Sequence, residues 1–387
     1  MRSREPDASG DVERDGVKLY YEVFGDGDPT VLLLPTWSIV HSRAWKAQIG
    51  YLARKHRVVT FDGRGNGRSG SPAAAEAYTH REFVADTIAV MDATDTDRAV
   101  LVALSMGALW GTQLAADKPD RVLGLVCIGP AVPFGDRHPD REAVSFDDEL
   151  DTTDGWAKYN RHYWVDGDYH DFLGFFFGQM FSEPHSTKQI EDCVGWGHEI
   201  APETLVATQD GASTLDAQRF RDTCGRVDCP VLVIHGHEDA IRAHESGVAF
   251  AEATGGSLVT ITGGGHGPLA RDPVKTNLLI EEFIGTVSST PPTRRLWTRA
   301  LNRPKRALYV SSPIGLGHAR RDIAIAQELR RLHPDLEIDW LAQHPVTTVL
   351  SSDGERIHPA SAHLTASASS LSSRSRSRIE DRGTPPS

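Results

Sequence analysis

Short apolar runs alternate with amphipathic stretches along most of this 387-residue chain. Val31–Leu34 is apolar at every position, which is typical of a strand covered on both faces. Arg81–Ala93 repeats its apolar residues at helical spacing. The alternation predicts an α/β fold, with a mostly parallel sheet and helices on both faces. Strands are expected at Val17–Phe24, Val31–Leu34, Arg57–Phe61, Ala99–Leu104, Val122–Ile128, Val231–His235 and Ser257–Thr262, and helices at Arg43–Lys55, Arg81–Ala93, from after Ser105 to about Lys118, and at Pro273–Gly285.

The alternation stops between Pro130 and about Arg226. This segment has no strand rhythm but is rich in aromatic residues, among them Trp156, Tyr159 and Phe175–Phe177. It lies between two predicted strands, so we expect a mostly helical lid inserted into the sheet domain. The first domain would then cover residues 1–287, with the lid at about 130–226.

Beyond residue 287 the pattern changes twice. Residues 288–305 contain two adjacent prolines and are expected to form a linker. Residues 306–360 start a second α/β unit. Residues 361–387 are rich in Ser and Arg, cannot bury a core, and are expected to be disordered. The expected elements of the second unit are the strand Ala307–Ser311, a glycine turn, the helix Arg320–Leu332 and the strand Leu336–Leu341.

Composition narrows the possible partners and locations. The formal net charge is −12, which argues against nucleic acid or an anionic membrane as the main partner. The first sixteen residues are polar and lack the apolar core of a signal peptide. No apolar run approaches the ~20 residues that span a bilayer, and the four cysteines show no paired spacing. We expect a cytoplasmic protein, and the composition leaves the oligomeric state open.

A serine stands between a predicted strand and a predicted helix, in the sequence Ala-Leu-Ser-Met-Gly. Small residues lie two positions before it (Ala103) and two after it (Gly107), as a sharp strand-to-helix turn requires. A serine on such a turn has a strained backbone and an exposed hydroxyl, so we predict Ser105 as a nucleophile. The free N–H groups at the start of the helix can stabilise an oxyanion, and the Met106 N–H is the expected first donor.

A second motif carries a family resemblance. The run from Phe61 to Ser69, Phe-Asp-Gly-Arg-Gly-Asn-Gly-Arg-Ser, resembles the Asp-x-Arg-Gly-x-Gly-x-Ser segment of α/β-hydrolases, and the serine turn follows at the usual distance. The resemblance covers roughly residues 16–287. It implies the α/β-hydrolase fold and serine esterase activity. Asp62 and Arg64 in this run are expected to brace the loop rather than to take part in chemistry.

The family's chain order is Ser, then acid, then His. Gly-His-Glu-Asp after the strand Val231–His235 looks like the family's acid loop, and the glycine-rich turn after the next strand looks like its histidine loop. The resemblance implies that Asp239 orients His266 and that His266 takes the proton of Ser105, which completes a catalytic triad. Glu238 is the alternative acid.

The second oxyanion donor is expected in the loop after Val31–Leu34. Many relatives have His-Gly there, whereas this chain has Pro35, Thr36 and Trp37. Proline has no N–H, so the predicted second donor of the oxyanion hole is the Trp37 N–H.

The acid loop also allows a metal-based interpretation. Residues 235–239 contain His-x-His-x-Asp, which resembles the ligand cluster of metallo-β-lactamase-type hydrolases. Those enzymes also carry a His directly after the Asp, where this chain has Ala240. We therefore expect neither a metal ion nor a cofactor.

The nucleophile indicates the reaction class. A serine implies an acyl-enzyme formed from a small-molecule acyl substrate, and it disfavours the epoxide-hydrolase and haloalkane-dehalogenase branches, which need a carboxylate. The aromatic lid favours a neutral, fairly hydrophobic ester. Thioester, lactone, carbon–carbon bond and perhydrolase chemistry stay open. The alternative function is a ligand-binding sensor without turnover, suggested by the unusual loop at Pro35–Trp37 and by the attached C-terminal segment.

The C-terminal segment carries a second resemblance. Residues 307–318 resemble the opening strand and glycine turn of GT-B glycosyltransferases, where a His in the turn can serve as a base, and His318 matches that position. A complete GT-B enzyme needs two Rossmann-like domains, and the nucleotide-sugar donor half is absent. The resemblance implies a truncated remnant of a hydrolase–glycosyltransferase fusion that does not transfer sugar.

Overall fold

The computed structural model describes residues 4–135, 139–212, 215–287, 305–311, 316–362 and 364. The chain divides into two compact units, Met1–Thr293 and Arg294–Ser387. Nearly all of the predicted linker, the glycine turn at 312–315 and the tail from residue 365 lie outside the described residues.

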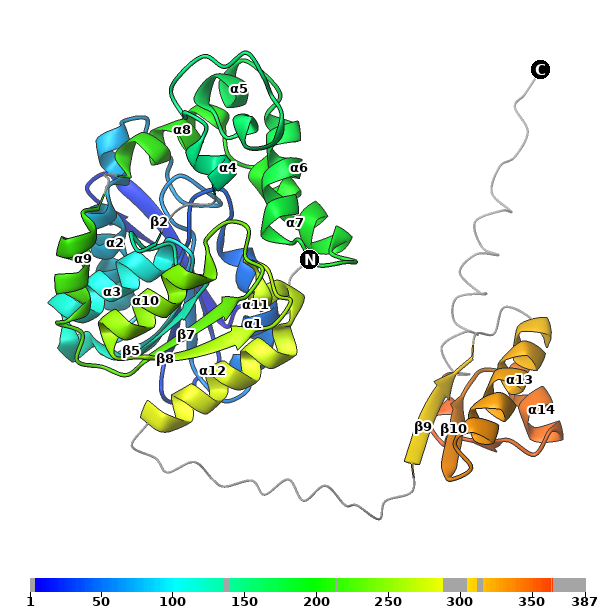
Figure 1. The fold of residues 1–387 in the computed structure, drawn as a ribbon. Coiled ribbons are helices and arrows are strands. Elements are labelled where there is room, and N and C mark those ends of the chain that lie inside the picture. Colours follow the sequence, from blue (N-terminus) through cyan, green and yellow to red (C-terminus); the bar gives the residue numbers. More distant parts are fainter. Residues whose placement is uncertain are drawn as a thin grey trace, which may run out of the picture. The chain divides into compact units, whose positions relative to one another are not determined.

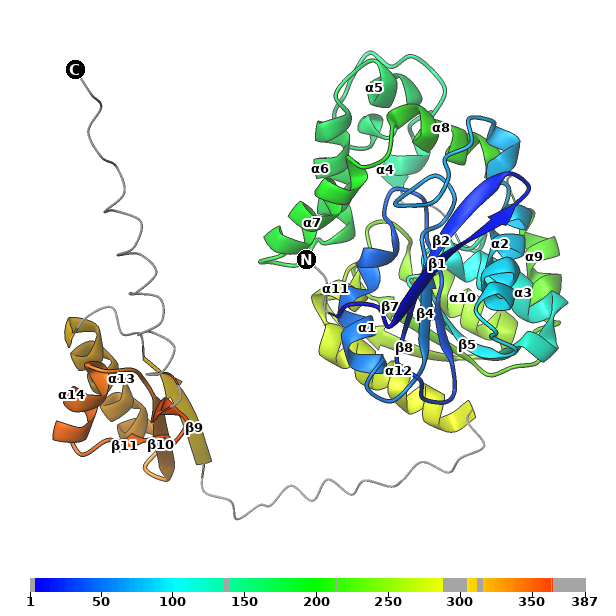
Figure 2. The same ribbon diagram turned by 180° about the vertical axis from the view of Figure 1, so that it is seen from behind.

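The first unit is built on an eight-stranded sheet with the order β1-β2-β4-β3-β5-β6-β7-β8 (Figures 1 and 2). The pairs β1·β2 and β2·β4 are antiparallel, and every other pair is parallel. The predicted mostly parallel α/β sheet is therefore confirmed. The strands are β1 (Ala8–Arg14), β2 (Val17–Phe24), β3 (Val31–Leu33), β4 (Val58–Phe61), β5 (Ala99–Leu104), β6 (Val122–Ile128), β7 (Val231–Gly236) and β8 (Ser257–Ile261).

Helices cover both faces of this sheet (Figure 1). Alternate residues of the central strands enter different cores, as the pleat requires: Val100 and Val102 of β5 join one cluster, and Leu101 and Ala103 join the other. One face packs against α2 (His80–Ala93), α3 (Gly107–Asp117), α9 (Ala217–Cys224) and α10 (His244–Thr254), and the other against α1 (Lys46–Leu52), α11 (Pro268–Arg271) and α12 (Pro273–Val287).

Every regular element that the structure describes between β6 and β7 is a helix, as the sequence predicts for the lid. Its helices from α4 to α8 gather beyond one end of the sheet, while α9 returns to the sheet face (Figures 1 and 2). The buried aromatic side chains between Trp156 and Phe181 belong to the same core cluster as α1 and α12, so the lid and the sheet share one core. These helices are α4 (Pro139–Glu142), α5 (Arg161–Val165), α6 (Tyr169–Met180), α7 (Thr187–Gly197) and α8 (Pro202–Gly211).

The second unit contains a three-stranded parallel sheet with the order β11-β10-β9. Its core consists of small and aliphatic residues around the fully buried Trp340. The elements are β9 (Lys305–Val310), α13 (Leu316–Leu332), β10 (Leu336–Leu341), α14 (Val346–Ser352) and β11 (Arg356–Ile357).

The structure differs from the sequence prediction in one missed strand and in the bounds of several elements. Strand β1 was not predicted, because its residues are largely polar and at most half-buried. Helix α13 begins at Leu316 rather than at Arg320. Among the described residues, none of the helices is long and apolar enough to cross a membrane.

Candidate active site

The predicted site residues all follow parallel strands at their carboxyl ends. Ser105 comes directly after β5, Asp239 three residues after β7, and His266 in the loop after β8. Trp37 lies in the loop after β3. Parallel strands end at a common edge, and ligands of open α/β sheets bind outside that edge.

Ser105 occupies a strained turn. Its φ is 52°, a left-handed conformation that costs a residue other than glycine roughly 1–2 kcal/mol. The turn is held on both sides, because Ser105 N–H donates to the Ile128 carbonyl (2.9 Å) and the Ser105 carbonyl accepts from Ala131 N–H (3.1 Å). Helix α3 then begins at Gly107. A serine hydroxyl is thereby held at the start of a helix, as the sequence predicts.

The need for glycine two residues later has a cause that the sequence did not reveal. A Cβ added at Gly107 would lie 2.5 Å from the Pro35 carbonyl oxygen, but 3.5 Å from the Ala103 methyl group. The loop after β3, rather than strand β5, therefore excludes a larger residue.

Asp239 is a buried carboxylate with four donors. Its Oδ1 accepts from the backbone N–H groups of Ile241 (2.8 Å) and Arg242 (2.9 Å). Its Oδ2 accepts from His266 Nδ1 (2.7 Å) and His235 Nε2 (3.0 Å). Burial alone would raise the pKa of this carboxyl, but the charge of His266 and the hydrogen bonds from both histidines lower the pKa well below its usual range. Asp239 is therefore ionised and fixed in orientation.

His235, which lies in strand β7, has a defined tautomer. Its Nε2 lies 3.0 Å from the Asp239 carboxylate and 3.2 Å from the Arg242 carbonyl oxygen, both of which can only accept. Nε2 therefore carries the proton. Among the described residues, buried Nδ1 has no hydrogen-bond partner, and it packs against Gly247, where an added Cβ would lie 2.1 Å away. His235 is thus a second donor to the predicted acid, a contact that the sequence analysis missed.

His266 is fully enclosed at the strand edge and is 3% exposed. Its backbone N–H donates to the Met180 carbonyl at the end of α6 (3.1 Å), and the preceding Gly265 N–H donates to Glu183 (2.7 Å). The end of a lid helix thus anchors the histidine loop.

Gly129 connects the surroundings of the serine and the histidine. A Cβ on Gly129 would lie 3.0 Å from His266 Nδ1, and the preceding residue, Ile128, accepts the Ser105 N–H. The two predicted residues therefore flank one short stretch of β6. Within the described residues the Ser105 hydroxyl itself makes no hydrogen bond.

The sequence analysis left two alternatives at the acid loop, namely Glu238 as the acid and a metal site at residues 235–239. Glu238 is exposed, and Asp239 rather than Glu238 contacts His266. His237 is also exposed, while His235 is buried and bonded to Asp239. In the described part of the chain, no three or more His, Cys, Asp or Glu side chains are arranged to hold a metal ion.

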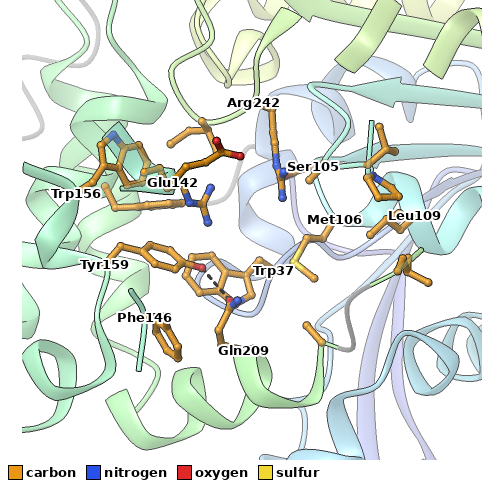
Figure 3. Close-up of a pocket in the computed structure, with 18 of the residues that line it drawn as sticks. Trp37, Ser105, Met106, Leu109, Glu142, Phe146, Trp156, Tyr159, Gln209 and Arg242 are labelled. Carbon is orange, nitrogen blue, oxygen red and sulfur yellow. Dashed lines mark hydrogen bonds between the residues drawn. The ribbon is translucent and has the colours of Figure 1, made fainter. Parts of the chain in front are cut away.

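A pocket of about 690 Å³ opens in front of Ser105. Figure 3 shows Ser105, Met106 and Leu109 on one side of it and the lid residues Trp156 and Tyr159 on the other. The volume lies within the range of sites for small organic ligands. The lid thus forms the wall opposite the predicted nucleophile.

Trp37 links the loop after β3 to the lid. Its ring lines the pocket, and its indole N–H donates to the Thr208 hydroxyl on α8 (2.9 Å). Its ring centroid lies 5.4 Å from that of Phe176 and 5.8 Å from that of Tyr159. Among the described residues, the backbone N–H groups of Trp37 and Met106 donate no hydrogen bond to a protein acceptor. Both N–H groups are therefore without an acceptor in the part of the protein that the structure describes.

Asp62 and Arg64 make the bracing contacts that the sequence suggested. Asp62 accepts from the Ser42 hydroxyl (2.6 Å) and the Arg68 N–H (2.9 Å). The buried Arg64 guanidinium pairs with both oxygens of Asp86 (2.6 and 2.7 Å). These contacts hold the loop after β4 against α2.

Comparison with known proteins agrees with this fold. The model of the family described as alpha/beta hydrolase fold matches residues 29–273. A putative non-heme chloroperoxidase from Synechocystis sp. is 31% identical over 286 residues, which covers 69% of this chain and 95% of that protein. A putative carbamate hydrolase, RutD, from Variovorax paradoxus is 41% identical over 112 residues, which covers only 28% of this chain and 41% of that protein.

Solved structures show the same architecture. The bromoperoxidase from Bacillus anthracis superposes with a TM-score of 0.59 at 23% identity, covering 72% of this chain and 99% of that one. The enol-lactonase from Burkholderia xenovorans superposes with a TM-score of 0.60 at 20% identity, covering 71% of this chain and 99% of that one. These likenesses concern the fold of the first unit.

Proposed function

The chain belongs to the α/β-hydrolase fold family, and from that premise we propose that it is a serine hydrolase acting through an acyl-enzyme, with Ser105 as nucleophile, His266 as general base and acid, and Asp239 as the orienting carboxylate. The observation that carries the proposal is the 2.7 Å hydrogen bond between His266 and the buried Asp239, at the sheet edge where Ser105 stands on a strained turn.

The reaction proceeds in two halves. Ser105 Oγ attacks the substrate carbonyl carbon while His266 Nε2 takes the hydroxyl proton. Collapse of the tetrahedral intermediate breaks the bond to the leaving oxygen, which receives that proton from His266. Water then attacks the acyl-enzyme and gives a proton to His266. The bond between the carbonyl carbon and Ser105 Oγ breaks, and the proton returns to Ser105. One water is consumed, and the products are an acid and an alcohol.

Asp239 keeps the His266 imidazole in the tautomer that these reaction steps require. Its carboxylate accepts the proton on Nδ1, which leaves the Nε2 lone pair for the serine. Because four donors hold Asp239 ionised, the carboxylate stabilises the imidazolium without taking its proton.

The oxyanion would be bound by two backbone N–H groups, those of Met106 and Trp37. Met106 lies at the amino end of α3, where the helix dipole adds positive potential. Trp37 is held by its indole contact with the lid. Because neither N–H is used within the described protein, both are available to the developing charge.

The substrate is proposed to be a hydrophobic carboxylic ester or a related acyl compound. Met106, Leu109 and Val132 give an apolar lining near the nucleophile. The relatives in the comparisons include an enol-lactonase, a bifunctional esterase/perhydrolase and a carbamate hydrolase, so the acyl chemistry of the family is broad.

Two measurements on the full chain test this function. Ser105→Ala should lose p-nitrophenyl ester hydrolysis by more than the roughly 10²–10³-fold that follows loss of one oxyanion donor, and a fluorophosphonate probe should label the parent at Ser105. Parental turnover in Ser105→Ala contradicts the assignment. Absent labelling together with tight ligand binding favours a sensor without turnover.

For residues 306–360 we propose a GT-B-like unit that does not by itself transfer sugar, because a GT-B enzyme needs two Rossmann-like domains. A parallel strand–helix–strand arrangement from β9 to β10 supports the likeness, and His318 is exposed in the first turn of α13. Titration with UDP- and dTDP-sugars should show no binding in the micromolar range, and micromolar binding would contradict the proposal.

A further inference from the structure

Arg141 brings a positive charge into the wall of the pocket that faces Ser105. It lies in the short lid helix α4 and lines the same cavity as Ser105. Its guanidinium carbon lies 4.4 Å from the ring centroid of Tyr159 and 5.2 Å from that of Trp156. Figure 3 shows these two rings across the pocket from Ser105. The guanidinium therefore stacks on the lid wall of the pocket.

The aromatic surface beneath Arg141 is rigid. Trp156 and Tyr159 are 5% and 8% exposed, and the Tyr159 hydroxyl donates to Gln209 (2.8 Å). A guanidinium stacks well on such faces, because it is planar and weakly hydrated. When a guanidinium stacks on a ring face, the N–H groups at its edge stay free to bind a planar anion. The rings of Trp156 and Tyr159 therefore hold the positive charge of Arg141 without forming an ion pair with it.

The acidic residues of the pocket do not neutralise Arg141. Among the described residues, it makes no ion pair and no hydrogen bond. Asp147 and Asp210 also line the cavity, but both bind Arg161 (2.7 and 2.6 Å). The other charged lining residues, Glu142 and Arg242, each already interact with another group. The unmatched charge at this wall is therefore positive.

We infer that the substrate carries a carboxylate at the end remote from the scissile acyl bond and that Arg141 binds it. This inference rests on the proposed hydrolase function. The substrate is then an acyl chain with an apolar middle and one anionic end, such as a half-ester of a dicarboxylic acid. A carboxylate fits the fork of a guanidinium with two parallel hydrogen bonds.

The test compares two p-nitrophenyl esters of one dicarboxylic acid, in which the far end is either a free carboxylate or its methyl ester. The parent should favour the free acid by about 10- to 100-fold in kcat/KM, the range for one hydrogen-bonded charge. Arg141→Gln should bring that ratio close to one. Arg54→Gln is the matched control: Arg54 lies 4.4 Å from the ring centroid of Tyr51 but does not line the pocket, so the ratio should keep its parental value.

The outcomes separate this inference from the function on which it rests. If both esters are hydrolysed in a manner that depends on Ser105, but the parent shows no preference for the free acid, the Arg141 inference is overturned and the hydrolase function stands. A preference that persists in Arg141→Gln overturns it equally. If Ser105→Ala hydrolyses the esters at the parental rate, or if the parent hydrolyses neither ester, the proposed function fails and the inference fails with it.

Discussion

His235 and His266 donate hydrogen bonds to the same oxygen of Asp239, at 3.0 and 2.7 Å. The Arg242 carbonyl fixes the proton of His235 on Nε2, so His235 is a permanent donor. The hydrogen bond from His235 to Asp239 Oδ2 reduces the negative charge with which this oxygen can stabilise His266. We therefore regard His235 as a positioning residue that acts on the predicted base through the acid.

Replacing His235 should shift the pH dependence of catalysis. In His235→Met the carboxylate loses one donor and stabilises the His266 imidazolium more strongly. Because the base must be neutral, the acid limb of kcat/KM moves to higher pH, by up to about one unit for one charged hydrogen bond. His235→Gln has an N–H₂ group near the Nε2 position and should keep the parental limb. An unchanged limb in His235→Met would show that the residue only fills space.

The strained turn predicts a stability difference between two inactive variants. Ser105 has a φ of 52°, which glycine adopts without penalty and alanine does not. Ser105→Gly should therefore be about 1 kcal/mol more stable than Ser105→Ala, although both lose the nucleophile. Denaturant unfolding of the two variants measures the difference. A Gly variant that is less stable than the Ala variant would mean that the turn is not strained.

The hydrogen bonds of Glu281 predict how the free energy of unfolding depends on pH. It accepts hydrogen bonds from His56 (3.2 Å) and Lys55. The bond from His56, together with the bond and charge of Lys55, outweighs burial and lowers the pKa of Glu281 to about 2. A carboxylate whose folded pKa is depressed stabilises the fold above its unfolded pKa, about 4.3, and this contribution disappears as the pH falls to about 2.

Glu281→Gln should therefore destabilise the protein at pH 7 and have little effect near pH 2. The loss should stay below about 1 kcal/mol, because the pair is partly exposed to solvent. Glu282→Gln, on the exposed neighbouring position, is the control and should leave the free energy of unfolding unchanged at both pH values. A loss in Glu281→Gln that persists near pH 2 would point to packing rather than charge.

The central strands could be predicted from sequence because each is apolar throughout. Strands β5 and β6 were predicted at their observed bounds, since strands covered on both faces have no polar positions. Strand β1 was missed because it pairs only with β2 at the edge of the sheet, so its polar residues face solvent and leave no apolar pattern.

The contacts around the site were less predictable than its motifs. Asp239 and His266 follow strands in an order that the family shares, and the structure joins them. Arg141 lies in a four-residue helix of the lid, where its charge looks like that of any surface residue. Its position depends on how the lid packs over the sheet, which no local spacing encodes. The same holds for Thr208, which contacts Trp37 across 171 positions of sequence.

The contact between Trp37 and Thr208 predicts a catalytic effect from a residue that touches no substrate. Thr208 is buried, and its hydroxyl accepts the indole N–H while donating to the Leu205 carbonyl (2.7 Å). Thr208→Val keeps the shape but leaves the buried indole N–H without an acceptor, which costs about 1–3 kcal/mol. The Trp37 ring can reduce this cost by moving, and its backbone N–H would move with it.

Because that N–H is the proposed second oxyanion donor, kcat should fall in Thr208→Val by up to about 10²-fold, the effect of losing one donor, while KM changes little. Thr208→Ser keeps the hydroxyl and should retain most of the parental kcat. Thr208→Val replaces only the hydroxyl and Thr208→Ser removes only the methyl group, so steady-state kinetics on a single neutral ester separates loss of the hydrogen bond from loss of packing. If Thr208→Val raises KM and leaves kcat unchanged, Trp37 shapes the pocket and does not contribute to the oxyanion hole.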